Sequence, residues 1–226
     1  MSSLLVLVPS RGRPDNIARL IARFRSTRSE DTRLLVAVDD DDETRDGYLQ
    51  MDSGEDWLEF VVGPRLRLAG TLNDLAPKYA DSYDVLGFMG DDHLPWVAGW
   101  DRRILEESGP GTVVYGNDLF QGANLPTAVF LDSGIVRALG YFVPTGMTHL
   151  FLDNAWQDWG TATGKLKYLP DVIIEHLHPA AGKSELDDRY TEVNSEAVWS
   201  ADELRYNEYK TNGEFAADIR KLQEIS

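Results

Sequence analysis

The chain has 226 residues, of which 42% are apolar, with no cysteine and a formal net charge of −16. This length and apolar content predict one sizeable α/β domain, or one domain with a short appendage. The missing cysteines exclude a disulfide framework, a cysteine-ligated zinc ion and a thiol nucleophile. The negative charge disfavours binding to nucleic acid or to anionic membranes.

The apolar runs are short. None approaches the ~20 residues that cross a bilayer, and the first residues lack the basic start of a signal peptide. We therefore expect no membrane span and a cytoplasmic location.

Apolar runs in the first part of the chain predict buried strands over residues 4–8, 33–38 and 57–62. The loop after the first strand carries Arg11 and Arg13, where a phosphate or ribose would approach. Solvated loop charges are the alternative for both. Asp39 is the first residue past the second strand, so it can hydrogen-bond a nucleotide base or ribose, or belong to a solvated acidic loop over 39–43.

A helix is expected from Thr71 to Tyr79, with Gly70 ending the preceding loop and Thr71 as the N-cap. Helix N-termini attract anions. Asn73, in the expected first turn, can meet a ligand or lie on the surface.

Residues 85–89 predict a central strand, and two adjacent carboxylates, Asp91 and Asp92, follow it. In open α/β sheets, ligands bind at the carboxyl ends of strands. Adjacent carboxylates repel each other unless a cation or proton lies between them. The pair therefore predicts a Mg²⁺ or Mn²⁺ site beside a phosphate-bearing substrate, with a solvated Asp-Asp turn as the alternative.

The second half predicts helices over 96–107 and 133–139, strands over 112–115 and 126–131, and a helix beginning near Asp153. A carboxylate in the first turn of a helix is stabilised by the helix dipole, so Asp153 is either a cap or a general base.

The last predicted strand, 166–177, brings His176 and His178 to one face at a spacing that suits a metal ion. One satisfied histidine at a strand end is the alternative. Beyond Gly182 the composition becomes polar and acidic, and surface helices are expected over 202–210 and 214–225.

In this order, over residues 4 to 180, the motifs resemble the GT-A class of nucleotide-sugar glycosyltransferases. The resemblance is closest to the large inverting family, which includes many small bacterial and phage-encoded enzymes. It implies a single Rossmann-like α/β domain with a mostly parallel central sheet flanked by helices. We place that domain at 1–182, with a nucleotide-sugar half at 1–95, an acceptor half at 96–182 and a helical appendage at 183–226. A phage-encoded enzyme would act in the host cytoplasm.

The resemblance also implies roles for individual residues. The first loop, Pro9, Ser10, Arg11 and Arg13, would wrap the nucleotide, Asp39 would meet the base, and Gly70, Thr71 and Asn73 would close over the nucleoside. Asp91 and Asp92 match the metal-binding "DxD" signature, although here it reads Asp-Asp-His, and Asp91 also falls among the donor-binding residues. His176 or His178 would add the late histidine to the metal. Asp153 falls at the catalytic base, where Leu152 replaces an acid that often precedes it. His149 and Asp158 are alternatives for the base.

The implied activity is metal-dependent transfer of a sugar from a UDP- or GDP-sugar to an unidentified acceptor hydroxyl, with inversion. Trp96, Trp156 and His149 are expected to form the acceptor platform. Two alternatives remain: a non-catalytic nucleotide- or carbohydrate-binding module on the same fold, and a nucleotidyltransferase. The latter usually has a glycine-rich basic loop after the first strand, where this chain has only Arg11-Gly12-Arg13.

Overall fold

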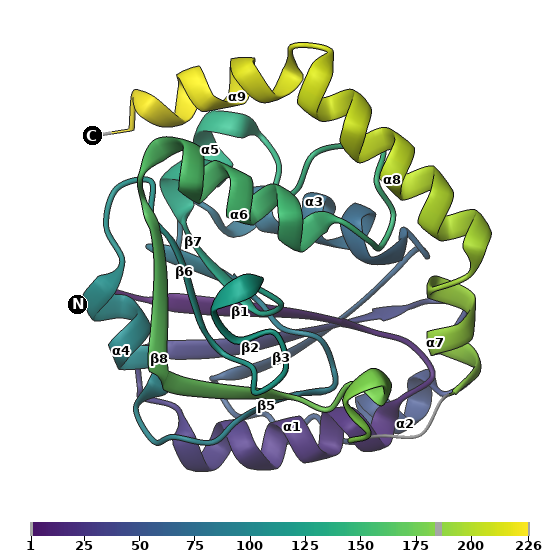
Figure 1. The fold of residues 1–226 in the computed structure, drawn as a ribbon. Coiled ribbons are helices and arrows are strands. Elements are labelled where there is room, and N and C mark those ends of the chain that lie inside the picture. The colour runs from purple at the N-terminus through teal and green to yellow at the C-terminus, as the bar shows by residue number, and fades with distance from the viewer. Residues whose placement is uncertain (1, 184–186, 226) are drawn as a thin grey trace.

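The computed structural model of this chain describes residues 2–183 and 187–225 and has an α/β architecture (Figure 1). Within these residues, eight strands form one sheet in the order β3-β2-β1-β4-β7-β6-β8-β5. Parallel pairing joins β3, β2, β1 and β4, and also β6 and β8. β7 is antiparallel to β4 and β6, and β5 is antiparallel to β8. The expected mixed, mostly parallel sheet with flanking helices is therefore confirmed. The strands are β1 (Leu4–Ser10), β2 (Thr32–Asp39), β3 (Leu58–Gly63), β4 (Val85–Phe88), β5 (His93–Pro95), β6 (Val113–Asn117), β7 (Val129–Asp132) and β8 (Leu166–His176).

Helices cover both faces of the sheet (Figure 1). One apolar cluster joins the sheet to α1 (Pro14–Thr27), α2 (Arg45–Leu49) and α4 (Trp100–Glu107). The other joins the opposite face to α3 (Arg67–Tyr79), α5 (Ser133–Leu139), α6 (Leu152–Thr163) and α9 (Glu214–Gln223). The remaining helices are α7 (Asp188–Val193), α8 (Glu196–Thr211) and the short 3-10 helices η1 (Gly122–Asn124) and η2 (Pro179–Ala181).

The central strand β1 explains why its sequence is apolar without interruption. Leu5 and Leu7 point into one cluster, whereas Leu4, Val6 and Val8 point into the other. Successive side chains of a strand face opposite sides of a sheet. Because helices cover both sides, residues 4–8 of the strand are all buried, as in other parallel sheets.

The C-terminal helices α8 and α9 carry buried polar groups as well as surface charges. α9 packs against α5 and α6. The phenol of Tyr209 on α8 accepts the indole N–H of Trp159 at 2.7 Å and donates to the carboxylate of Asp218 on α9 at 2.8 Å. Tyr209 is fully buried. These helices therefore form part of the layer that covers the sheet.

Three predicted helix starts are wrong. The helix expected from residue 96 begins at Trp100, because 93–95 form β5, which pairs with β8 in a register that sets His93 opposite His176. The helix expected from Thr71 begins at Arg67, so Thr71 lies inside α3 and does not cap it. The helix expected over 202–210 begins at Glu196. The first of these errors arises from a tertiary contact, the pairing of β5 with β8.

In the described parts of the chain, no helix combines the length and the apolar character that a bilayer crossing requires.

Candidate functional site

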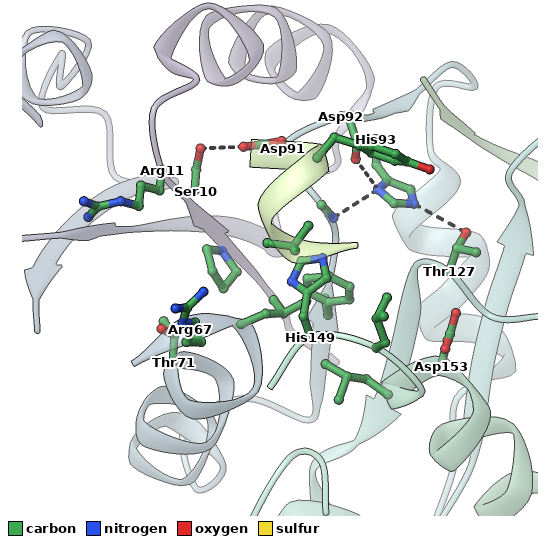
Figure 2. Close-up of a pocket in the computed structure, with 18 of the residues that line it drawn as sticks. Ser10, Arg11, Arg67, Thr71, Asp91, Asp92, His93, Thr127, His149 and Asp153 are labelled. Carbon is green, nitrogen blue, oxygen red and sulfur yellow. Dashed lines mark hydrogen bonds and ion pairs between the residues drawn. The ribbon is translucent and has the colours of Figure 1, made fainter. Parts of the chain in front are cut away.

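A cavity of about 290 Å³ lies where β1, β2 and β4 end, and Figure 2 shows many of the side chains that line it. Strand ends of this kind are the usual ligand sites of open α/β sheets. Most of the predicted site residues line the cavity: Pro9, Ser10, Arg11, Arg13, Asp39, Thr71, Asp91, Asp92, His149, Asp153, Trp156, His176 and His178. Among the described residues, three predicted ones stand outside this lining: Gly70, Asn73 and Trp96.

Asn73 and Trp96 make other contacts. The Asn73 side chain accepts the backbone N–H groups of 142 and 143 and donates to the carbonyl oxygen of Val143 at 2.9 Å. The Trp96 ring lies 3.6 Å from the guanidinium of Arg23, and its indole donates to Glu175 at 2.8 Å. Asn73 therefore braces a loop, and Trp96 packs on α1. Their contacts with a nucleoside and an acceptor stay predictions.

Asp91 is the buried member of the carboxylate pair, with 7% of its surface exposed. Its oxygens accept the hydroxyl of Ser10 at 2.7 Å, the guanidinium of Arg13 at 3.2 Å and the amide of Asn16 at 3.4 Å. Burial, and then the charge of Asp92, raise the pKa of the Asp91 carboxyl, although Arg13 and these hydrogen bonds oppose the rise. Asp91 is therefore held by the first loop and its following helix.

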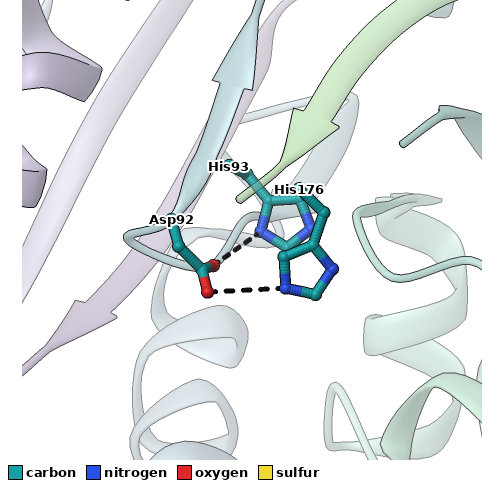
Figure 3. Close-up of side chains that lie close together, drawn as sticks. All are labelled: Asp92, His93 and His176. Carbon is teal, nitrogen blue, oxygen red and sulfur yellow. Dashed lines mark ion pairs between the residues drawn. The ribbon is translucent and has the colours of Figure 1, made fainter. Parts of the chain in front are cut away.

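Asp92 faces two histidines (Figure 3). One oxygen lies 3.3 Å from Nδ1 of His93 and the other 3.4 Å from Nε2 of His176. Burial opposes the charge of Asp92, but its close contacts with the rings of His176 and then His93 outweigh burial and hold the pKa of the carboxyl well below its usual range. The three residues each bring one possible ligand atom within 4.8 Å of the others. They form a candidate metal centre.

The histidines of this region differ in which nitrogen is available. Nδ1 of His178 accepts the backbone N–H of Ala180 at 3.1 Å, and Nδ1 of His93 accepts that of Gly90 at 3.0 Å. A ring nitrogen that accepts a hydrogen bond has its lone pair engaged. Burial, and then the neighbouring His93, lower the pKa of His176, although Asp92 opposes the shift, and the neutral ring is the form that ligates metals. His176 is therefore the best suited of the three to join Asp92.

Asp153 lies in the first turn of α6, across the cavity from Ser10 and Arg11 in Figure 2. Burial raises the pKa of its carboxyl to about 6, although the backbone N–H of Asn154 favours the charged form. Phe151, just before α6, has a φ of 64°, which is rare for a residue with a side chain. A carboxyl with such a pKa can accept a proton near neutral pH, as a general base must.

The loop before α6 is held by the C-terminal helix α8. Asp202, which is 1% exposed, accepts the backbone N–H groups of 148, 149 and 150, each at 2.8 Å. His149 and the next four residues of the chain line the cavity. The helix α8 therefore positions the cavity wall that carries His149 and leads into Asp153.

Arg11, Arg13 and Arg67 line the cavity, and Arg65 lies beside Arg67. Arg11 pairs with Asp39 at 3.1 Å and also with Asp41. Arg65 and Arg67 both contact the Glu192 carboxylate of α7, at 2.6 and 2.9 Å. Each of these guanidinium groups is therefore partnered by a carboxylate.

Arg13 lies between two carboxylates. It bonds to Asp91 and makes two hydrogen bonds, at 2.7 and 2.6 Å, to Asp187, the residue that caps α7. Tyr190, Val193 and Asn194 also line the cavity, so α7 forms part of its wall. The segment after residue 182 thus contributes directly to the site.

Sequence reasoning missed His93, Arg65, Arg67 and the contribution of α7. His93 follows Asp92 directly, and this adjacency was a usable signal. Its role became visible only with the pairing of β5 and β8, which sets His93 opposite His176 and stacks their rings 4.2 Å apart. No local sequence pattern predicts the contacts of α7, because its partners lie more than 120 positions earlier in the chain.

No protein-family model matches the sequence, and no curated protein matches it. Solved structures do share its fold. The mannosyltransferase PcManGT from Pyrobaculum calidifontis, solved with GDP-Man and Mn²⁺, superposes with a TM-score of 0.60 at 11% identity, over 97% of this chain and 73% of that one. S. aureus TarS 1–349, solved with UDP, gives 0.59 at 12% identity, over 76% of this chain and 59% of that one. A second TarS structure gives 0.58 at 13% identity, over 92% of this chain and 45% of that one. The chain therefore spans about half of TarS and shares the α/β, Rossmann-like fold of these structures.

Proposed function

We propose that this protein is a metal-dependent glycosyltransferase that moves a sugar from a nucleotide-diphospho-sugar to an acceptor hydroxyl, with inversion. The observation that carries the proposal is one cavity that joins the Asp92–His176 pair, a rim of arginines and the raised-pKa carboxyl of Asp153. The fold shared with a mannosyltransferase that was solved with GDP-Man and Mn²⁺ supports it.

The residues around Asp92 suit a divalent cation. Nδ1 of His93 already accepts a hydrogen from Gly90, yet it lies 3.3 Å from an Asp92 oxygen, so two acceptors face each other. A cation beside Asp92 relieves this repulsion. A carboxylate with a neutral imidazole favours Mn²⁺, whereas Mg²⁺ prefers oxygen ligands and water. When bound through Asp92 and His176, the ion supplies positive charge for the departing nucleoside diphosphate.

The residues of the chain then divide the reaction between them. Arg11 and Arg13 bind and orient the donor at the end of β1, where they add charge stabilisation for its phosphates. Asp153 takes the proton of the acceptor hydroxyl. The acceptor oxygen forms its bond to the anomeric carbon while the bond from that carbon to the phosphate oxygen breaks. The nucleoside diphosphate leaves with the bonding electrons, and Trp156 and His149 contact the acceptor sugar.

The first test is a thermal-shift screen of UDP- and GDP-sugars with and without Mn²⁺. A ligand at about 100 times its Kd stabilises the folded state by about 2.7 kcal/mol, which the screen detects readily. We expect a shift only when Mn²⁺ is present, and we expect Asp92→Ala to abolish it. Asp74→Ala, which removes an exposed ion pair with Lys78 on α3, is the control and should respond like the unsubstituted chain.

The outcomes separate the alternatives. Unchanged nucleotide affinity of Asp92→Ala in Mn²⁺ would refute the metal site. Donors that bind but release no nucleoside diphosphate with any acceptor tested, or with water, would favour a non-catalytic binding module.

A further inference from the structure

Asp118 is a buried carboxylate that follows β6, next to the candidate metal centre, and 3% of its surface is exposed. One oxygen, Oδ1, accepts the backbone N–H groups of 120, 121 and 122 at 2.7 to 2.9 Å. The other, Oδ2, accepts the hydroxyl of Thr127 at 2.8 Å. These contacts fix the carboxylate rigidly and maintain its charge away from water.

The backbone ties Asp118 to His176. The N–H of His176 donates to the carbonyl oxygen of Asp118 at 3.0 Å, so the ends of β6 and β8 are held together at these two residues. Oδ2 of Asp118 lies 3.9 Å from Nδ1 of His176. That nitrogen is buried and has no hydrogen-bond partner in the described parts of the chain. The nearest carboxylate is therefore about 1 Å beyond ordinary hydrogen-bond distance.

The other nitrogen of the same ring, Nε2, faces Asp92 at 3.4 Å. A neutral imidazole carries one proton. With the proton on Nε2, the ring donates to Asp92. With the proton on Nδ1, the ring offers its Nε2 lone pair at the position where Asp92 would share a cation. An acceptor beside Nδ1 selects the second form, as carboxylates commonly do behind metal-ligating histidines.

We infer that Asp118 is a positioning residue for the metal centre: its Oδ2, 3.9 Å from Nδ1 of His176, favours the tautomer with the proton on Nδ1 and so leaves Nε2 to face a divalent cation beside Asp92. This inference rests on the proposed metal site. The hydrogen bonds that Oδ1 accepts from the 118–122 turn explain the position of Oδ1 only. They do not account for Oδ2, which accepts the hydroxyl of Thr127 and also lies 3.9 Å from Nδ1 of His176, a buried nitrogen without a hydrogen-bond partner among the described residues.

Asp118→Asn tests the inference. Its side-chain oxygen can still accept the three turn N–H groups, but its amide would donate toward Nδ1 and favour the tautomer with the proton on Nε2. The measurement is Mn²⁺ affinity, from the electron paramagnetic resonance signal of free Mn²⁺, with and without GDP or UDP. We expect a loss of about 10- to 100-fold. Asp132→Asn is the control, because Asp132 braces Gly111 at the opposite end of the sheet, and its affinity should be unchanged.

A double-mutant cycle separates positioning from bracing. If Asp118 acts through His176, then His176→Ala and the double variant should bind Mn²⁺ equally weakly, because the partner is already gone. A further loss in the double variant would assign Asp118 a structural role and overturn the inference. Unchanged affinity of Asp118→Asn would also overturn it.

This test is independent of sugar transfer. If the unsubstituted chain transfers sugar but Asp118→Asn binds Mn²⁺ normally, the proposed function stands and the inference about Asp118 is refuted. If Asp118 and His176 are coupled in Mn²⁺ binding but the chain transfers no sugar, only the proposed sugar transfer is refuted. If the chain binds no Mn²⁺, with or without GDP or UDP, both the proposed metal site and the inference about Asp118 are refuted.

Discussion

Replacement of Asp153 by asparagine should make the protein more stable at alkaline pH. Burial raises the pKa of the carboxyl from 3.8 to about 6, so the folded chain favours the protonated form. The stability that this proton contributes is complete below pH 4 and is lost as the pH rises through 6. Asparagine resembles the neutral carboxyl and can still accept the backbone N–H of Asn154 at 3.0 Å. The variant should therefore avoid the cost of a buried charge.

The size of the effect follows from the shift. About two pKa units correspond to about 3 kcal/mol, an upper limit, because each unit is worth about 1.4 kcal/mol. The Asp153 side chain is partly exposed at the cavity wall, so solvent screening reduces this to about 1–2 kcal/mol. Urea unfolding at pH 8 in the presence of a chelator should reveal this gain for Asp153→Asn, and the difference from the unsubstituted chain should fall toward zero below pH 4.

Asp158 on the same helix provides the matched control. It pairs with Lys210 at 2.5 Å and accepts the hydroxyl of Tyr206, so Asp158→Asn should gain nothing at pH 8. Equal stability of Asp153→Asn and the unsubstituted chain at pH 8 would refute the argument from burial.

The same variant should lose catalysis. A general base contributes about 10²- to 10⁴-fold, so Asp153→Asn should bind donor normally but transfer sugar that much more slowly. In the unsubstituted chain, kcat/KM should rise with pH and level off above about 6, as measured by nucleoside diphosphate release. If Asp153→Asn is both more stable and inactive, Asp153 is a functional residue whose presence lowers the stability of the fold. Full activity would move the base to another residue.

Two further outcomes follow from the C-terminal segment. Asp187→Asn keeps a residue that can cap α7 but weakens the ion pair with Arg13. The affinity for GDP or UDP, measured by calorimetry, should therefore rise about two- to fivefold. The control is Asp171→Asn at an exposed position, which should leave this affinity unchanged. Asp202→Ala leaves three part-buried N–H groups, those of 148–150, without their acceptor and should cost about 3 kcal/mol in urea unfolding.

The parts of the fold that sequence predicted best are those set by local burial. Leu4 to Val8 form an uninterrupted apolar run, and β1 contains all of it. The polar residues that end β1, β2 and β4 meet in one cavity, because parallel strands bring their carboxyl ends to the same edge of the sheet. Arg11, Asp39 and Asp92 could therefore be assigned to one site from the sequence alone.

The parts that sequence missed depend on contacts between distant segments. β5 exists because His93 to Pro95 pair with β8, some 80 positions later, and the pattern around Trp96 was taken for the start of a helix instead. Likewise, Arg13 and Asp187 are 174 positions apart, and neither residue carries a local sign of the other. Ion pairs of surface loops have no periodicity, so a sequence pattern cannot predict them.

The charges of the cavity explain why donor binding should need a cation. Its described lining holds four carboxylates, Asp39, Asp91, Asp92 and Asp153, and three guanidinium groups, those of Arg11, Arg13 and Arg67. Each of these arginines is paired with a carboxylate, which reduces the positive charge that it adds for a diphosphate. A divalent ion beside Asp92 would reverse the sign of the cavity and attract the diphosphate. Nucleotide binding should therefore weaken sharply when the metal is removed, more than the loss of any single arginine would cause.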